Sequence, residues 1–438
     1  MNQTASNNIG SNSSLSFEQF NSYDPYFTNN EGNELFLALA KPEIVQDPYP
    51  YYHYLYSKGP INWLPDKTRP SKGYYMVHDY SIIEELFKSS KVGNDDAHLN
   101  WSDEQRTKIE KLTKVNPYIR MVNHWLINLD PPEHTKNRSI MNKVFTPKRV
   151  RELNDPIYNL ANSLVNDIKD KNTFNLLTDF AYPFPILVIA SLLGVPSNDL
   201  NVFKKWANTL LVMFKQEELN QQERNLLNKD VLEMQKFFAK LLQEKRKNPS
   251  NDLISDLVMN NDSEIPQETI IDHLIGLLFA GHETTKNLIA NGAYHLLKHP
   301  DQISLLQNDS SLYPNAVEEA LRYDAPVQYD FRYSYDDFDF NGSKIKPGFP
   351  IGMMIGSANR NESSNPDPDS FDITRKNIKH LSFARGVHYC LGAPLARLEG
   401  KIAFETLFTS FKNLQLAEQP KYRIQPGFRG LESLMVKI

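Results

Sequence analysis

Apolar residues recur at steps of three and four along most of the chain, which is the spacing of one face of an α-helix. The clearest stretches predict helices over Asp155 to Lys171, Leu200 to Phe214, Arg224 to Asn248 and Thr269 to His299. Because such stretches dominate the sequence, we predict a large helical body.

Strand patterns are short and lie near the two ends of the chain. Alternating or β-rich residues occupy Gly73 to Val77 and Ile345 to Ile355, the latter with a Pro-Gly-Phe-Pro turn. Lys421 to Ile438 resembles strands around a Gly-Phe-Arg-Gly turn. Strands do not alternate regularly with helices, which argues against a parallel α/β sheet. The predicted fold class is therefore mainly α with small β-sheets.

The N-terminal sequence MNQTASNNIGSNSSLSFEQF is polar and has neither a basic start nor an apolar centre. It is therefore no secretory signal, and we expect residues 1–30 to form a disordered tail. No linker or repeat divides the remainder, so we expect one domain over 31–438. The longest uncharged apolar run, Phe184 to Val195, is shorter than the ~20 residues that span a bilayer. We expect a cytoplasmic monomer without a membrane anchor.

Composition narrows the function classes. A net charge of -5 and the lack of a basic, aromatic-rich segment give no indication of nucleic-acid binding. Neither GxGxxG nor GxxxxGK[ST] occurs, so the sequence shows no loop for a dinucleotide or a nucleoside triphosphate. If the protein is an enzyme that needs reducing equivalents, we expect it to receive them from another protein.

The single cysteine, Cys390, lies in the stretch LSFARGVHYCLGAPLARLEG. A lone cysteine is commonly a small buried apolar residue. Here Gly386 and Gly392 flank it, and Pro394 suits the first turn of a following helix. Backbone N–H groups and the helix dipole at such a start favour the thiolate over a thiol with an ordinary pKa of about 8.5. We therefore predict a metal ligand.

The spacing around this cysteine resembles the haem-binding loop of the cytochromes P450, F-x-x-G-x-[HR]-x-C-x-G. The matching residues are Phe383, Gly386, His388, Cys390 and Gly392. The resemblance implies haem b as cofactor, Cys390 as axial iron ligand and Phe383 packed beside its sulfur. Ala384 departs from the family, whose bacterial members usually carry glycine there. We expect the extra methyl group to be tolerated and to tighten the loop against the porphyrin.

The helix predicted over Thr269 to His299 carries a second motif. Gly281, Thr284 and Thr285 interrupt its apolar stripe, and a mid-helix glycine costs about 1 kcal/mol relative to alanine. A packing notch for a crossing helix would explain this. Alternatively, residues 280–285, AGHETT, resemble the oxygen-activation motif of P450s, [AG]-G-x-[DE]-T-[TS].

That resemblance implies a role for each motif residue. Ala280 and Gly281 would lie against the haem, with Gly281 leaving room for dioxygen. Thr284 would hydrogen-bond to dioxygen or a water, and Glu283 would relay protons from solvent. We assign no role to His282.

A helix start precedes a pair of candidate propionate ligands. Asp130 as N-cap, Pro131 at the first position and Glu133 three residues after the cap predict this start. His134 and Arg138 then lie four residues apart on one face. A solvated helix face is the plain interpretation, but P450s carry H-x-x-x-R here.

The resemblance thus implies that His134 and Arg138 reach a haem propionate. His388 and Arg332 are further candidates for the propionates. A separate group matches the structural E-x-x-R pair of P450s and its later arginine: Glu319, Arg322 and Arg375. We expect this trio to support the cysteine loop.

The resemblance extends from about Asp47 to the C-terminus and is strongest to soluble bacterial P450s, including polyketide and macrolide hydroxylases and the biotin-pathway fatty-acyl enzyme of bacilli. It implies a haem-thiolate monooxygenase that hydroxylates or otherwise oxidises a hydrophobic polyketide, terpenoid or fatty-acyl substrate, free or bound to a carrier protein. We expect the pocket walls at the loop Gly93 to His124, the segment Leu200 to Asn220, Val327 with Gln328, and near Leu431.

Electrons would come from a ferredoxin or flavodoxin with its NAD(P)H reductase. Arg385, Arg397 and Lys401 would offer a cationic docking face for such an acidic partner. An ordinary solvated helix surface is the alternative for Arg397 and Lys401.

Other functions remain open at this point. A haem-thiolate peroxygenase or a carbon–carbon-cleaving acyl oxidase would keep the same loop, as would a haem sensor without enzymatic activity. The presence of Glu283 and Thr284 favours dioxygen activation. A cysteine hydrolase is a further alternative, although a tight loop would have to fold His388 back onto its near neighbour Cys390.

Overall fold

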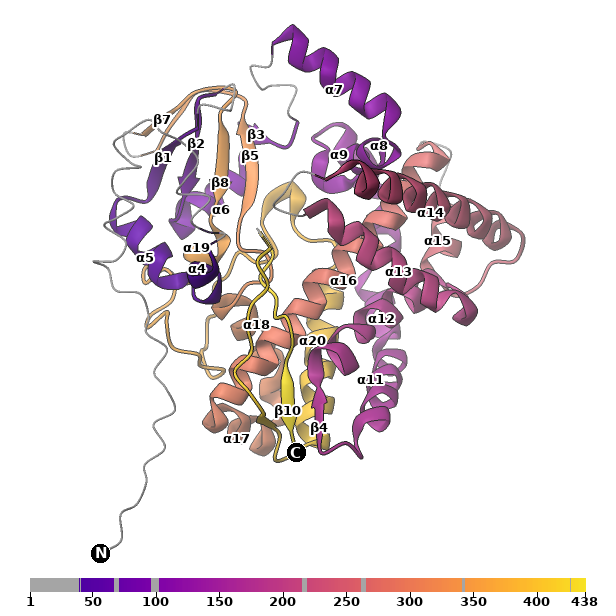
Figure 1. Cartoon of the computed structure of the whole chain (residues 1–438), viewed down its shortest axis with the longest axis vertical. Coiled ribbons are helices and arrows are strands. Elements are labelled where there is room, and N and C mark those ends of the chain that lie inside the picture. The colour runs from indigo at the N-terminus through magenta and orange to yellow at the C-terminus, as the bar shows by residue number, and fades with distance from the viewer. Residues whose placement is uncertain are drawn as a thin grey trace, which may run out of the picture.

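A computed structural model describes Leu39 and residues 41–66, 71–95, 102–214, 219–260, 265–340, 343–425 and 427–438. The expected N-terminal tail, 1–30, lies outside the described residues. Figure 1 shows a β-sheet with its own small helices on one side and a larger helical body on the other. The C-terminus lies in the helical part, beside β4 and β10.

Helices make up most of the described chain. Their bounds are α4 Pro42–Gln46, α5 Tyr49–Ser57, α6 Tyr80–Lys88, α7 Asp103–Val115, α8 Pro117–Asn123, α9 Glu133–Val144, α10 Pro147–Glu152, α11 Asn154–Ile168, α12 Pro183–Leu193, α13 Leu200–Leu211, α14 Gln221–Lys247, α15 Leu253–Asn260, α16 Gln267–Lys298, α17 Pro300–Asn308, α18 Tyr313–Tyr323, α19 Ile355–Asn359 and α20 Ala393–Ser410. Short helical turns are η3 Leu126–Asn128, η4 Leu177–Ala181, η5 Ser197–Asp199, η6 Val212–Phe214, η7 Ser310–Leu312 and η8 Gly386–His388.

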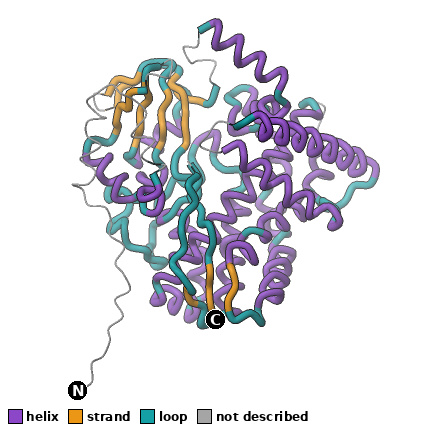
Figure 2. Tube along the Cα trace, viewed as in Figure 1, coloured by secondary structure: helices purple, strands orange, loops and turns teal. Residues whose placement is uncertain are grey.

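The largest sheet joins distant parts of the chain. Its strands, in spatial order, are β1 Ile61–Pro65, β2 Gly73–Val77, β8 Pro350–Met353, β5 Asp330–Ser334 and β3 Val92–Gly93. β2 and β8 run parallel, with Tyr75 opposite Ile351, and the other neighbours are antiparallel. Figure 2 shows these strands gathered together, apart from the helices. The sheet closes one side of the molecule.

Two smaller sheets complete the strand content. One contains β4 Thr173–Asn175, β10 Met435–Lys437 and β9 Gln415–Leu416, and the other pairs β6 Phe338–Phe340 with β7 Ser343–Ile345. All of these pairs are antiparallel. The fold is mainly α with small sheets, as the sequence predicted.

The helix α16 forms the centre of the helical body and contacts α12, α14, α18 and α20. Most of its side chains are buried, as an apolar helix surrounded by others requires. In mid-helix, however, a stripe of residues remains accessible: Gly276, Leu277, Ala280, Gly281 and Thr284. This stripe includes three residues of the AGHETT motif.

The long predicted helices correspond to α11, α13 with η6, α14 and α16, and the predicted strand 73–77 is β2. The interpretation of residues 93–124 as a loop was wrong, because α7 and α8 occupy much of it. The helix α7 has no described buried residue and projects from the body in Figure 1. Its polar sequence lacks the apolar stripe on which the prediction relied. No helix among the described residues is both long and apolar enough to span a membrane.

Candidate functional site

The cysteine loop is held in a defined turn ahead of α20. The backbone N–H of Cys390 donates to the carbonyl oxygen of Phe383 over 2.9 Å. Gly386 has φ of 66°, and a Cβ atom there would lie 2.2 Å from the carbonyl oxygen of Phe87. Glycine is therefore required at 386 both by conformation and by the closeness of α6. At Gly392 a Cβ would meet nothing within 4 Å, so that side of the loop is open to a flat ligand.

Ala384 has φ of 54°, in the left-handed region where a Cβ atom is unfavourable. From the sequence we expected the Ala384 methyl group to be tolerated and to tighten the loop against the porphyrin. The structure adds an effect on the backbone itself, because alanine here adopts a conformation that glycine adopts without cost.

The Cys390 thiol does not have the lowered pKa that the helix start predicted. Burial raises its pKa, and this effect exceeds the opposing hydrogen bonds from the Gly392 and Ala393 N–H groups and the nearby charges of Arg138 and Arg397. The prediction was wrong for the protein without a bound cation because local sequence shows the N–H groups but not the burial. The same groups would stabilise a thiolate once a metal ion supplies the compensating charge.

His134 and His388 face each other beside this loop. Their ring centroids lie 4.3 Å apart. His134 is 2% exposed, and both of its ring nitrogens are buried without a hydrogen-bond partner among the described residues. Burial, together with the charges of His388, Arg138 and Arg332, lowers the pKa of His134 to about 4. A buried imidazole with two unused nitrogens indicates a site for a polar ligand.

The other predicted propionate ligands lie in the same region. Arg138 donates through Nη2 to the carbonyl oxygen of Tyr389 over 2.7 Å, which ties α9 to the cysteine loop. Arg332 is buried on β5 and donates to a carboxylate oxygen of Asp330 over 2.7 Å. His388 Nε2 lies 3.1 Å from the Asn94 amide nitrogen and 3.6 Å from an Asp130 oxygen. Arg138, Arg332 and His388 all lie near enough to His134 to affect its pKa, so the structure brings these four basic side chains together.

Asp130 is not the N-cap that the sequence indicated. The helix α9 begins at Glu133, its N-cap is Pro132, and no side chain caps it. One oxygen of Asp130 instead accepts hydrogen bonds from the backbone N–H groups of Asn94 and Asp95, each over 2.8 Å, and from the Tyr335 hydroxyl. These partners, distant in sequence, occupy the carboxylate that the local pattern assigned to the helix.

The donor set fits haem b. A thiol on an accessible loop suits the iron, and the open side of Gly392 suits the edge of a flat macrocycle. The unpartnered nitrogens of His134 and the guanidinium of Arg138 suit carboxylates such as the propionates. Phe383 is buried beside the loop, and the Arg397 guanidinium lies 4.5 Å from its ring centroid.

Some residues of the AGHETT motif lie on the accessible face of α16, and some pack against other parts of the protein. A Cβ atom at Gly281 would lie 2.6 Å from the Ile189 Cδ1 of α12, so this glycine is also the notch for a crossing helix. The Thr284 hydroxyl donates to the Ala280 carbonyl oxygen over 2.6 Å. His282 points into protein, where Nε2 lies 3.3 Å from the Tyr182 carbonyl oxygen.

Glu283 is buried among cations that the sequence analysis did not identify. Lys286 Nζ lies 2.5 Å from its Oε2, and Arg423 Nη2 lies 2.5 Å from its Oε1. Burial alone would raise the pKa of Glu283, but Lys286 and Arg423 outweigh it and the pKa lies below its ordinary value. Lys286 was visible as an i, i+3 neighbour, whereas no local signal indicates Arg423.

The expected structural trio is assembled as the sequence indicated. Arg322 donates to both carboxylate oxygens of Glu319 over 2.7 Å, and Arg375 Nε donates to the same carboxylate over 3.2 Å. Both arginines also donate to the Ser370 carbonyl oxygen. The trio therefore fixes the segment that leads into the cysteine loop.

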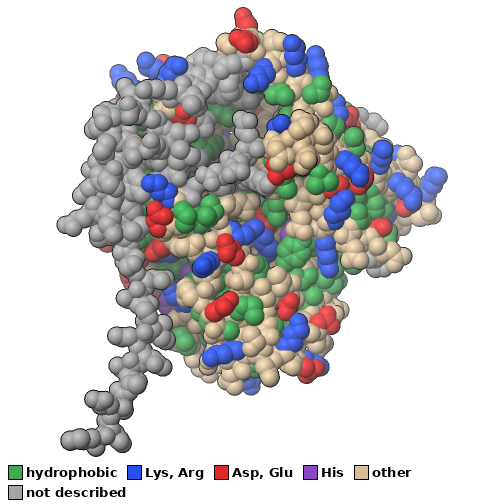
Figure 3. Space-filling view, in the orientation of Figure 1, with side chains coloured by type: hydrophobic (Ala, Val, Ile, Leu, Met, Phe, Trp, Pro, Cys, Tyr) green, Lys and Arg blue, Asp and Glu red, His purple; other side chains and the backbone are tan. Residues whose placement is uncertain are grey.

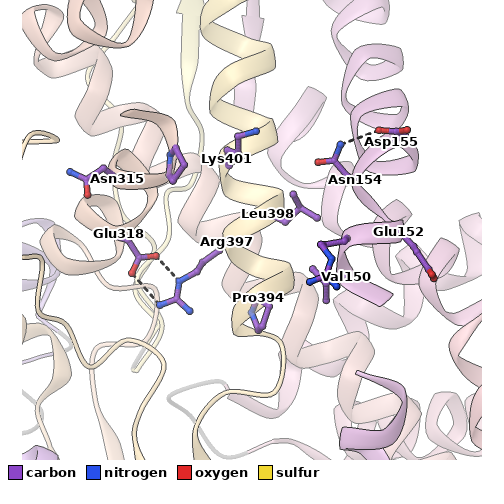
Figure 4. A pocket seen from close by; sticks show the side chains of 12 residues that line it. Val150, Glu152, Asn154, Asp155, Asn315, Glu318, Pro394, Arg397, Leu398 and Lys401 are labelled. Carbon is purple, nitrogen blue, oxygen red and sulfur yellow. Dashed lines mark hydrogen bonds and ion pairs between the residues drawn. The ribbon is translucent and has the colours of Figure 1, made fainter. Parts of the chain in front are cut away.

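A groove of about 790 Å³ lies between α10, α11, α18 and α20, next to the start of the helix that follows Cys390. Figure 4 shows Arg397 pointing across it to Glu318, with which it forms two hydrogen bonds of 2.6 and 3.1 Å. Lys401 pairs with Glu405 at 3.3 Å, and Arg385 with Glu84 at 3.4 Å. The three arginine and lysine residues expected to form a cationic docking face are thus each paired with an acid.

Fold and site together define a haem-thiolate enzyme of the oxygen-activating kind, and comparisons with known proteins agree. The family model described as cytochrome P450 matches residues 118–434. The biosynthetic enzyme PksS of Bacillus subtilis, described as a polyketide biosynthesis cytochrome P450, is 36% identical over 334 residues, covering 75% of this chain and 81% of the relative. The biotin biosynthesis cytochrome P450 of the same organism is 33% identical over 404 residues, 91% of this chain and 98% of the relative.

A solved structure gives the same result for the fold. P450BioI in complex with an acyl carrier protein ligated to hexadec-9Z-enoic acid superposes with a TM-score of 0.81 at 31% identity, covering 90% of this chain and all of that one. The chain belongs to the cytochrome P450 family. It is accordingly an oxidoreductase of the monooxygenase class with haem b as its cofactor.

Proposed function

We propose that this P450 inserts oxygen into a hydrophobic small molecule at a haem held by Cys390. The observation that carries this proposal is the convergence of the Cys390 loop with an unpartnered buried imidazole, His134, and its neighbour Arg138. When bound, the haem supplies an iron that activates dioxygen while the thiolate donates electron density to it.

The residues of the chain divide the remaining tasks. Cys390 binds the iron, with Phe383 and Gly392 beside it, and His134, Arg138, Arg332 and His388 orient the propionates. Ala280 and Gly281 lie on the accessible stripe of α16, where the small side chain of Ala280 would leave room for a ligand and Gly281 lets α12 pack closely. The Thr284 hydroxyl holds a proton at Oγ1 on that stripe, and Glu283 provides a carboxyl group behind it.

The substrate is proposed as a fatty-acyl or polyketide chain. Support comes from the relatives, since PksS is described with polyketide biosynthesis and P450BioI was solved with an acyl carrier protein. Carriage on such a protein is a specific form of the proposal. Binding of myristic acid, measured as a change in the haem absorption spectrum, tests the fatty-acyl class directly.

We further propose a ferredoxin or flavodoxin, with its NAD(P)H reductase, as electron donor to a cytoplasmic monomer. On the face shown in Figure 3, blue and red side chains are interspersed. The pairing of Arg385, Arg397 and Lys401 with acidic residues favours docking through shape and mixed charge over a purely cationic surface.

The decisive experiment is the visible spectrum of the reduced, CO-bound protein, repeated with Cys390→Ser. Thiolate ligation shifts the Soret band strongly to the red, and we expect this shift in the wild-type protein but not in the variant. A protein that binds no haem, or that shows the spectrum of a nitrogen-ligated haem, would contradict the proposal.

A further inference from the structure

Two cations enclose the carboxylate of Glu283. Lys286 occupies Oε2, while Arg423 and the amide of Asn287 occupy Oε1, the latter over 3.1 Å. Among the described residues, none of the hydrogen bonds of this carboxylate involves Thr284, whose hydroxyl donates to Ala280. Glu283 can therefore take up a proton only from one of these partners or after one of them has moved away.

The two cations differ in how firmly they are held. Arg423 also donates to the Asn287 side chain over 3.3 Å, and its backbone N–H donates to the Gly430 carbonyl oxygen over 2.9 Å. A Cβ atom at Gly430 would lie 2.6 Å from Arg423 Nη2, so the loop fits closely around the guanidinium. A guanidinium does not lose its proton in proteins. Arg423 is thus a permanent, anchored cation.

Lys286 has the opposite properties. It extends from the same helix on a flexible stem, its ammonium contacts Glu283 Oε2, and its side chain is 5% exposed compared with 27% for Arg423. Two cations for one carboxylate leave a buried excess of positive charge, which is unfavourable. Burial lowers the pKa of Lys286 to about 8, with a further contribution from Arg423. Of the two, Lys286 is the cation that can discharge near neutral pH.

The other titratable groups that face this cluster do not compete for that role. His282, on α16, has its pKa lowered to about 4 by burial and by Lys286, so it is neutral above that value. Tyr182, just before α12, has its pKa raised by burial, so it keeps its proton. The pKa of Glu283 lies below its ordinary value, so its resting form is the carboxylate.

We propose that Lys286 is a positioning residue that controls proton supply through Glu283. The inference rests on the proposed function. The proton on Nζ passes to Oε2 of Glu283, leaving a neutral amine and a neutral carboxylic acid. The Glu283 carboxylic acid then releases that proton to the dioxygen-activation reaction. The Lys286 amine takes up a proton from solvent water, which returns the pair to its starting charges.

Two substitutions separate this role from a structural one. In Lys286→Arg, a permanent cation keeps Oε2 covered and cannot pass on its proton. In Lys286→Met, Oε2 is open to water and Arg423 still pairs with the carboxylate. A structural ion pair would be rescued by arginine and lost with methionine. Proton control predicts the reverse order.

The assay measures the rate of dioxygen consumption, with a surrogate ferredoxin and its reductase supplied in excess. We expect dioxygen consumption at pH 7.5 to be at least threefold faster in Lys286→Met than in Lys286→Arg, with the wild type no slower than Lys286→Met. In the wild type, consumption falls as pH rises above about 8, because the neutral amine has no proton to give. This alkaline decline is absent from both variants. Equal rates, or a faster Lys286→Arg, would overturn the proposal.

A second measurement needs no haem. Since the folded pKa of Lys286 is about 8 and the unfolded value is near 10.4, the unfolded chain binds more protons between these values. The thermal midpoint of the wild type should therefore rise between about pH 8 and 10 relative to Lys286→Met. Lys298→Met, at the exposed end of α16, should behave as the wild type. The lack of a rise in a protein with an intact thiolate spectrum would overturn this inference alone, whereas a missing thiolate spectrum would overturn the proposed function on which it rests.

Discussion

The ring centroids of His134 and His388 lie 4.3 Å apart, and in the part of the chain that the structure describes neither nitrogen of His134 has a hydrogen-bond partner. Two facing imidazoles next to Arg138 form a basic site at the cysteine loop that is suited to carboxylates. Because an unsatisfied buried polar group costs about 1–3 kcal/mol, a ligand that fills the site gains affinity from it.

We therefore predict that His134→Leu weakens haem binding. Loss of a hydrogen bond to a charged group, worth about 1.5–3 kcal/mol, corresponds to roughly a tenfold or greater loss of affinity. The haem-to-protein ratio and the rate of haem transfer to apomyoglobin would measure this. His282→Gln, on the far side of α16, serves as control and should keep normal haem content. Unchanged haem transfer in His134→Leu would remove its role.

Thr284→Ala should retain haem and substrate binding but lose coupling. The accessible hydroxyl is the proton-holding group on the stripe, so its removal should let reduced oxygen escape as free peroxide. Product formed and peroxide released per NAD(P)H consumed give the measurement. Thr285→Ala, at a buried neighbouring hydroxyl, is the matched control. A normal product yield in Thr284→Ala would contradict the assignment.

Ala384→Gly should stabilise the protein by about 1 kcal/mol, because alanine at φ of 54° has an unfavourable backbone conformation and glycine has none. Denaturant unfolding of the two proteins would measure the difference. Ala396→Gly, within α20, should instead destabilise by about 1 kcal/mol. If both changes destabilise equally, the backbone at 384 is not strained.

Because of Glu399, we expect part of the protein's stability to be lost as pH rises. It is buried in α20, its Oε2 has no hydrogen-bond partner among the residues that the structure describes, and burial raises its pKa well above the ordinary value. Between the unfolded pKa, near 4.3, and the higher folded value, the unfolded chain binds fewer protons, so stability falls as pH rises. Glu399→Gln should be more stable than the wild type at pH 8 by about 1 kcal/mol or more, with the difference shrinking toward pH 4.

Because of Asp324, we expect the opposite pH dependence, with stability lost as pH falls. It is buried and accepts hydrogen bonds from the Tyr49 and Tyr422 hydroxyls over 2.7 Å and from His295 over 3.0 Å, beside Arg429. Burial alone would raise its pKa, but Arg429 and the hydrogen bonds lower it overall. Its contribution is therefore present above the unfolded pKa, near 3.9, and lost as pH falls below it.

Asp324→Asn should lower stability at pH 7 by about 3–5 kcal/mol, since it leaves a buried arginine without its carboxylate. Unfolding midpoints from pH 7 to 3 should fall less steeply in the variant. Asp301→Asn, at an exposed position in α17, should follow the wild type throughout. Parallel curves for Asp324→Asn and the wild type would rule out this titration.

Local patterns predicted what local forces determine. The apolar spacing located α16 to within two residues, and the alternation at 73–77 matched β2. The polar helix α7 was missed because it buries no apolar stripe. Asp130 was misassigned because Asn94, Asp95 and Tyr335 take its oxygen.

The candidate site likewise has some features set by neighbouring residues and others set by segments distant in sequence. The spacing of residues 383–392 indicated the haem loop, since every member belongs to one continuous short segment. The pKa of Cys390 and the contact of Arg423 with Glu283 depend on burial and on segments far apart in sequence. No pattern within a short window contains that information.

The parallel pairing of β2 with β8 has a consequence for biosynthesis. β2 leaves the ribosome roughly 270 residues before its partner, and at about 5–20 residues per second this delay is on the order of tens of seconds. During that time the nascent β1–β2 hairpin presents an open edge to chaperones and to neighbouring chains. Slower translation upstream of β8 should therefore increase aggregation more than an equal delay after it.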